Sequence, residues 1–168
     1  TQALLGVGVT SVVSMTDDPR DLRALREGVA LGRLRAPRVF FAGAAITSPG
    51  GHPTELFSFS AALVERLTRQ VSTAAEAEKA VGDLATRQVD LIKLVLESGR
   101  PGQPLPRMDE QVFRTAVRAA KKARLRTTVH VSTDADVRLA VDAGVDGIEH
   151  VPGDLSEETI RMMAAKKT

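Results

Sequence analysis

Short apolar runs rich in Val, Ile and Leu alternate along the chain with segments whose apolar residues recur at helical spacing. The runs are continuous rather than alternating, which is typical of parallel strands buried on both faces. They predict strands at Gly8–Met15, Arg38–Ile46, Val89–Leu96, Arg126–Val131 and Val145–Val151.

The segments between these runs carry helix start and stop signals. Asp17 or Asp18 is placed to cap the first helix, Gly144 to end a later one, and Asp154 or Ser156 to cap the last. The other predicted helices run from Thr73 to Arg87, from Asp109 to about Ala123 and from Asp134 to Ala143. Residues 56–71 fit either an insertion or a short helix.

The strand–helix unit therefore repeats about five times with short connections, which predicts an α/β fold with a parallel sheet and right-handed crossovers. An open doubly wound sheet and part of a (β/α)8 barrel both satisfy this order. The absence of a Gly-rich dinucleotide loop after the first strand disfavours the doubly wound fold. Since five units cannot close an eight-stranded barrel, we expect residues 1–168 to form a single domain that is a partial TIM-like barrel.

Lys93 lies inside the predicted strand VDLIKLVL, on the face opposite Ile92 and Leu94. Burial of an ammonium group is costly and lowers its pKa. A neutral amine can act as a base, form a Schiff base, or take up carbon dioxide to give a carbamate whose two oxygens can bridge two metal ions. A lysine that snorkels at a strand end, or that pairs with an acid, explains this position equally well.

His130 and His150 stand at or near the C-terminal ends of the next two strands, TTVHV and DGIEHV. Such strand ends converge on the face of a barrel where catalytic and metal-binding groups are placed, and neutral imidazole is a common zinc ligand. One such histidine is more often a core residue, but two on successive strands, together with Lys93, favour a metal site. Glu149 is expected on the opposite face from His150 and is assigned no catalytic role.

His52 follows the second strand in the sequence PGGHP, where Gly50 and Gly51 allow the backbone to approach a ligand closely. A substrate contact and a loop histidine without a role are equally consistent with this position. We expect substrate specificity to lie in the strand-to-helix loops, chiefly Thr47–Gln70 and Glu97–Arg107.

Several of these segments resemble the amidohydrolase superfamily, in particular its imidazolonepropionase-like and Xaa-Pro dipeptidase-like branch. GVGVTSVVSM is similar to the family's second-strand segment, and APRVFFAGAAITSPGGH to its Pro-Arg, Ala-Gly and Gly-Gly-His stretch. VDLIKL resembles the segment with the metal-bridging carboxylated lysine, and TTVHV and AVDAGVDGIEH resemble the two histidine strands that follow. The last of these is the most specific.

The resemblance implies a barrel of which this chain is the central portion, without the first and last strands. It implies hydrolysis of a C–N bond in an amide, peptide or cyclic amide, by water that one or two divalent ions, zinc before others, activate. By position, Lys93 would be the carbamate bridge, His130 and His150 would be ligands of the more exposed ion, and His52 would lie near the substrate.

Two parts of the family pattern are absent from this sequence. The chain has no His-x-His pair, which the family carries on its first strand, and no Asp on a last strand beyond His150 to handle the proton of the attacking water. We therefore assign no catalytic residue within the chain and expect a truncated barrel that binds one metal ion weakly and is inactive alone.

Two other functions remain open. An aldolase-like barrel enzyme would use Lys93 as a Schiff-base amine, which makes the histidines incidental. A non-catalytic fragment, or a half-barrel that assembles with another chain, would need no metal, and its open strand edges would favour pairing.

The composition of the chain limits the classes of molecule that it is expected to bind. With 43% hydrophobic residues the chain is not disordered, and with 3% aromatic residues and no Trp or Tyr it has little to stack on bases. Basic and acidic residues are mixed, with a net charge of +2, so we expect no nucleic-acid partner. No apolar run is long enough to cross a bilayer, and no Cys can serve as ligand or nucleophile. We expect a small-molecule or peptide-like substrate, a possible homo-oligomer, no membrane partner and, by preference, a cytoplasmic location.

Overall fold

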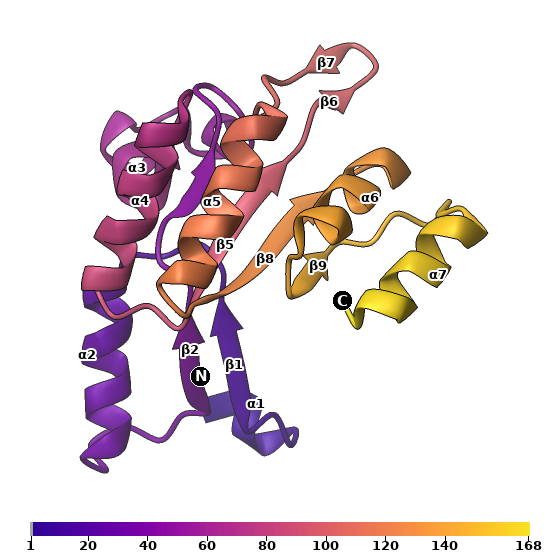
Figure 1. The fold of residues 1–168 in the computed structure, drawn as a ribbon. Helices are drawn as coiled ribbons and strands as arrows, with labels where there is room; N and C mark the ends of the chain where they lie inside the picture. Colours follow the sequence, from indigo (N-terminus) through magenta and orange to yellow (C-terminus); the bar gives the residue numbers. More distant parts are fainter. Residues whose placement is uncertain (1) are drawn as a thin grey trace.

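A computed structural model describes residues 2–168, and its centre is a five-stranded parallel sheet in the order β4–β3–β5–β8–β9 (Figure 1). The strands are β3 (Ala45–Thr47), β4 (Thr68–Gln70), β5 (Leu91–Leu96), β8 (Arg126–Val131) and β9 (Gly147–Glu149). Two further strands, β1 (Ser11–Ser14) and β2 (Arg38–Phe41), form a separate parallel pair. The predicted α/β class with parallel strands is confirmed.

The single strand predicted over Arg38–Ile46 is two strands joined by a kink. Gly43 lies between β2 and β3 with φ of +71°, and a Cβ atom there would come within 2.9 Å of Pro19 and 3.2 Å of Leu84. Both the backbone angle and the close packing therefore require glycine at this position. Along one edge, β1 pairs with β2 and β4 pairs with β3, so β4 continues the sheet where β1 ends.

The helices follow the strands as expected. They are α1 (Gln2–Gly6), α2 (Pro19–Ala30), α3 (Ala61–Leu67), α4 (Ala74–Thr86), α5 (Glu110–Lys122), α6 (Asp134–Ala143) and α7 (Glu157–Lys166), with a 3₁₀ turn, η1 (Thr54–Phe57). Helices α4 and α5 lie against one face of the sheet (Figure 1). There Ile92, Leu94, Phe113 and Val129 are fully buried in one apolar cluster. Because side chains alternate along a strand, the residues next to these on β5 and β8 point to the opposite face of the sheet.

Side-chain caps set most of the helix starts. Asp18 caps α2, Asp109 caps α5 and Ser156 caps α7, while Thr73 forms a capping box at the start of α4. Gly144 ends α6 in the left-handed conformation, with φ of +84°. The sequence signals at the helix ends are therefore confirmed, with Asp18 rather than Asp17 and Ser156 rather than Asp154 as the caps.

Three local expectations need correction or completion. Residues 56–71 contain the short helix α3 and also β4, a strand too short and too polar to be predicted. The loop Glu97–Arg107 contains a small antiparallel hairpin, β6 (Gly99–Arg100) with β7 (Gln103–Pro104). The strand β1, predicted to be buried, leaves Val13 47% exposed, because β2 is its only strand neighbour among residues 2–168. Nor does this part of the chain form any helix long and apolar enough to cross a membrane.

Candidate metal and substrate site

Lys93 is buried in the middle of β5, on the face that does not contact the helices. Its side chain is only 5% exposed, whereas its strand neighbours Ile92 and Leu94 point into the apolar cluster beneath the helices. Burial lowers the pKa of the Lys93 amine to about 8, and the nearby Glu149 carboxylate opposes that shift. A neutral amine is therefore accessible close to neutral pH, as carbamate formation requires.

All three histidines of the chain gather above this lysine. His130 lies on β8, whose register pairs it with Val95 of β5, so its side chain shares the face of Lys93. The centroid of the His130 ring lies 4.5 Å from that of the His52 ring and 4.9 Å from that of the His150 ring. The loop after β3, the strand β8 and the residue that follows β9 therefore bring the three imidazoles of the chain together.

His150 reaches this cluster through an unusual backbone conformation. It follows β9 directly and has φ of +58°. The other residues with positive φ that are not glycine, Gln88, Arg124 and Lys167, follow helices, where this conformation is a common way to end. A non-glycine residue held there away from a helix end costs roughly 1 kcal/mol or more and is often found at functional sites.

Glu97 holds the central histidine in place. Its Oε2 atom lies 3.1 Å from Nε2 of His130, and its Oε1 accepts hydrogen bonds from the amide of Gly99 and the hydroxyl of Ser132. Glu97 is the first residue after β5, so the strand itself directs the carboxylate at the end of β8. The Glu97 carboxylate is therefore either an orienting partner of His130 or an additional oxygen ligand.

The protonation of His130 is set by this environment. Burial is the largest cause and lowers the pKa of its imidazole, and the positive potential of His52, Lys93 and His150 lowers it further. The contact with Glu97 acts in the opposite direction. The net shift favours neutral imidazole, which is the form that binds a metal ion.

Glu149 and His52 complete the polar groups of the site. Glu149 accepts a hydrogen bond of 2.6 Å from the hydroxyl of Thr128, which stands opposite Lys93 in the sheet register. Our expectation that Glu149 lies on the far face from the site is therefore wrong: because His150 adopts a left-handed conformation, strand alternation does not extend to it. His52 contacts Glu55 through Nδ1 at 2.6 Å.

A pocket of about 560 Å³ opens beside the histidine cluster. Its walls come from the two loops that the sequence associates with specificity, with His52 and Glu55 on one side and Glu97 and Arg100 on the other. Of the three histidines, His52 lines this pocket, and Glu97, which contacts His130, lines it as well.

The donor types suit a divalent ion, although a complete set of ordinary ligands is not present. Among residues 2–168, no group of three or more His, Cys, Asp or Glu side chains is arranged to hold a metal ion. The candidate set depends on Lys93, which becomes an oxygen donor only as a carbamate. Two imidazole nitrogens, one carbamate oxygen and a water fit the chemistry of a zinc site with an open position.

Sequence reasoning found Lys93, His130, His150 and His52, and the structure brings all four together. It missed Glu97, which stood at the start of a predicted loop. The signal that could have found it is its position directly after a buried strand, one alternation step beyond Val95 on the face of Lys93.

Solved structures share this arrangement of elements. A Xaa-Pro dipeptidase with methionine bound in its active site is 27% identical, with a TM-score of 0.75, and a prolidase complexed with N-methylphosphonate-L-proline is 25% identical, with a TM-score of 0.78. An amidohydrolase is also 25% identical, with a TM-score of 0.78. The resemblance to amidohydrolases is confirmed.

The chain corresponds to only part of each of these three structures. The chain is covered over 95–98% of its length by these three structures but spans only 41–42% of theirs. The predicted partial TIM-like barrel therefore holds. No protein-family model and no curated protein matches the sequence.

Proposed function

We propose that this chain is the central part of a metal-dependent amidohydrolase that cleaves C–N bonds of amide, peptide or cyclic amide substrates. The observation that carries the proposal is the convergence of the chain's three histidines on the face of a buried lysine. The similarity to a prolidase and to a Xaa-Pro dipeptidase supports a small peptide-like substrate.

In this proposal Lys93, as a carbamate, and the imidazoles of His130 and His150 are the metal ligands, with zinc the preferred ion. When bound, the ion supplies Lewis acidity, which lowers the pKa of a water molecule and polarises the scissile carbonyl. The burial of Lys93 excludes bulk water from its amine, and Glu97 fixes the orientation of the His130 ring.

The remaining groups would bind the substrate. His52, oriented by its contact with Glu55, faces the pocket between the two loops, and Arg100 offers a positive charge on the opposite wall. A peptide-like substrate with a free carboxylate matches that charge. No residue of this chain matches the acid that the family uses to move the proton of the attacking water, so we propose no catalytic step for the isolated chain.

The proposal is tested by zinc binding to the full chain, measured by isothermal titration calorimetry and by the metal content of the purified protein. We expect one weakly bound ion per chain. His130→Ala, His150→Ala and Lys93→Met should each weaken binding by about tenfold or more, whereas Arg161→Ala, a surface change on α7, should leave it unchanged.

Two results would contradict this assignment. Unchanged zinc binding in His130→Ala and His150→Ala would show that these histidines are not ligands. Two tightly bound ions per chain would show that the chain contains further ligands besides Lys93, His130 and His150. Circular dichroism spectra of each variant and of the unaltered chain show whether the variant is folded, and so distinguish loss of a ligand from loss of the fold.

The buried amine of Lys93 also suits a Schiff-base enzyme, because such a lysine must be held away from water in a carbonyl-binding pocket. Borohydride reduction in the presence of a small aldehyde or ketone, followed by peptide mass spectrometry, distinguishes the two functions. A covalent adduct at Lys93 would favour the Schiff-base enzyme over the carbamate.

A further inference from the structure

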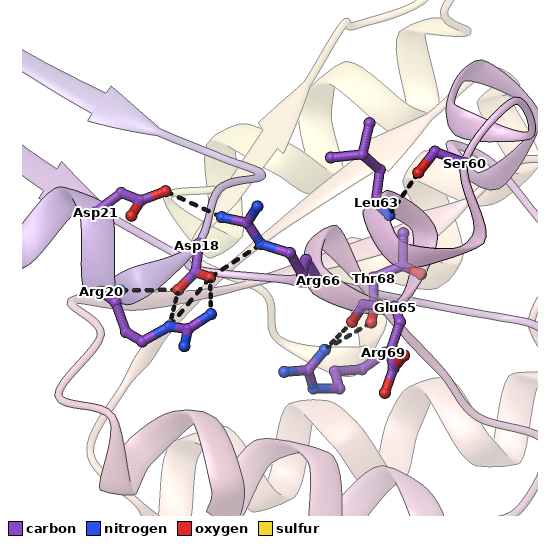
Figure 2. Close-up of polar contacts among 9 residues, drawn as sticks. All are labelled: Asp18, Arg20, Asp21, Ser60, Leu63, Glu65, Arg66, Thr68 and Arg69. Atoms are coloured by element: carbon purple, nitrogen blue, oxygen red, sulfur yellow. Dashed lines mark hydrogen bonds and ion pairs between the residues drawn. The ribbon is translucent and has the colours of Figure 1, made fainter.

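A second polar cleft, of about 1070 Å³, lies away from the histidine cluster, among α2, α3, β4 and α4. None of the candidate metal or substrate residues lines it. Its charged residues are the cations Arg20, Arg66, Arg69, Lys79 and Arg87 and the carboxylates Asp18, Glu65 and Asp83. Figure 2 shows the part of the cleft where α3 and β4 face the start of α2.

Most of these charges are neutralised within the cleft. Asp18 accepts hydrogen bonds from Arg20, at 2.7 Å from Nη2, and from Arg66, at 3.2 Å from Nε. Asp83 pairs with Lys79 at 2.6 Å. Within the described residues 2–168, neither Arg69 nor Arg87 forms an ion pair, and neither does Glu65, so the unpaired charges of the cleft are two positive and one negative.

The guanidinium of Arg69 forms hydrogen bonds to the described residues through one of its three nitrogen atoms. Its Nη1 atom donates to the backbone carbonyls of Glu65 and Thr68, at 2.7 and 2.8 Å, and so holds the end of α3 (Figure 2). Its Nε and Nη2 atoms form no hydrogen bond to any residue from 2 to 168. The edge that these two atoms share is the fork that binds two oxygens of one anion.

The cleft also holds Arg69 in an environment that opposes its charge. Burial lowers the pKa of the guanidinium, and the like charge of Arg87 lowers it further. The carboxylates of Asp83, Glu65 and Asp18 act in the opposite direction, but none of the three forms an ion pair with Arg69. The negative charge of a bound anion would offset both the cost of burial and the repulsion from Arg87.

We propose that this cleft binds a phosphate group of a small molecule through the Nε–Nη2 edge of Arg69, with Arg87 as the second cation. The ordinary structural explanation, in which Arg69 only caps α3, accounts for Nη1 but leaves the other edge and Arg87 without a partner. A phosphate presents three acceptor oxygens to Arg69 and Arg87, whereas a carboxylate presents two, and the cleft keeps a net positive charge with Glu65 counted. The volume of the cleft leaves room for the rest of a phosphorylated molecule.

The test is a titration of the full chain with inorganic phosphate at pH 8 and low ionic strength, followed by ¹⁵N NMR of the arginine side chains. We expect the Nε–H signal of Arg69 to shift with saturation, and acetate to bind at least several-fold more weakly. Arg69→Lys keeps the charge but loses the fork, and Arg87→Leu removes an exposed cation. Each should weaken phosphate binding by about tenfold.

Arg161→Leu on α7 is the matched control, since it removes an exposed arginine outside the cleft, and it should bind phosphate as the unaltered chain does. Unchanged binding in both Arg69→Lys and Arg87→Leu would overturn the proposal. So would acetate binding as tightly as phosphate, or phosphate shifts confined to residues outside the cleft.

Discussion

Replacement of Asp18 should separate the two roles of this residue, which caps α2 and neutralises two arginines. Its carboxylate accepts the backbone amide of Arg20 at 2.9 Å and side-chain hydrogen bonds from Arg20 and Arg66. Asp18 itself is only 6% exposed, whereas Arg20 and Arg66 are 69% and 46% exposed. The buried partner is thus the one whose loss matters most.

The expected cost follows from these contacts. Loss of an N-cap costs about 1 kcal/mol, and ion pairs with well-exposed arginines contribute about 0.5 kcal/mol each. Asp18→Ala should therefore lower the free energy of unfolding by about 2 kcal/mol. Asp18→Asn keeps a good cap and loses only the charge, so it should cost about 1 kcal/mol.

The pH dependence has a definite sign. The hydrogen bond from the Arg20 side chain is the largest cause that lowers the pKa of Asp18 below its usual range in the folded protein. The advantage of the unaltered chain over Asp18→Asn should therefore be complete above the unfolded pKa of about 4. It should be lost as the pH falls through the lower folded value.

Urea unfolding followed by circular dichroism, at neutral pH and at several acidic values, measures both quantities. If Asp18→Ala unfolds at the same urea concentration as the unaltered chain, the contacts contribute nothing and the reasoning is refuted. If Asp18→Asn is as unstable as Asp18→Ala, the ion pairs rather than the cap hold this corner. Asp18→Asn should also tighten phosphate binding in the arginine cleft, because the cleft loses one negative charge and Arg20 loses its ion pair, while Arg66 keeps its contact with Asp21.

Two further predictions concern the core and the histidine cluster. Phe113→Ala should lower the free energy of unfolding by about 3–5 kcal/mol, since the ring is fully buried, whereas Phe59→Ala, at an 80% exposed position, should change it by less than about 0.5 kcal/mol; urea unfolding compares them. Glu97→Gln should weaken zinc binding by about tenfold or more in calorimetry, because His130 loses a charged orienting partner. Equal affinity in the two proteins would mean that Glu97 neither orients His130 nor binds the ion.

The strand β5 and the caps at Asp109 and Gly144 could be predicted because their signals are local. A continuous apolar run, a capping carboxylate and a glycine at a left-handed position each need only a few neighbouring residues. The strand β4 could not be predicted, because three polar residues become a strand only through pairing with β3, in the place that β1 leaves open.

The residues of the candidate site also differ in whether local sequence signals predict them. Lys93, His130 and His150 stood out because a buried lysine and two strand-end histidines are rare in apolar runs. The contact of Glu97 with His130 joins residues 33 positions apart, and the register between β5 and β8 creates it. The register between two strands that are distant in the sequence does not follow from the local pattern of either strand.

The sequence by itself determined most of the long strands and helices and three of the candidate site residues, Lys93, His130 and His150, because hydrophobic period, caps and strand-end chemistry are local properties. Only the tertiary structure decided that His52 stacks beside His130, that a left-handed turn brings His150 to the same cluster, and that Arg69 keeps one edge free in a cleft. Those relations depend on how distant elements pack, since side chains meet across a fold through its register and its kinks.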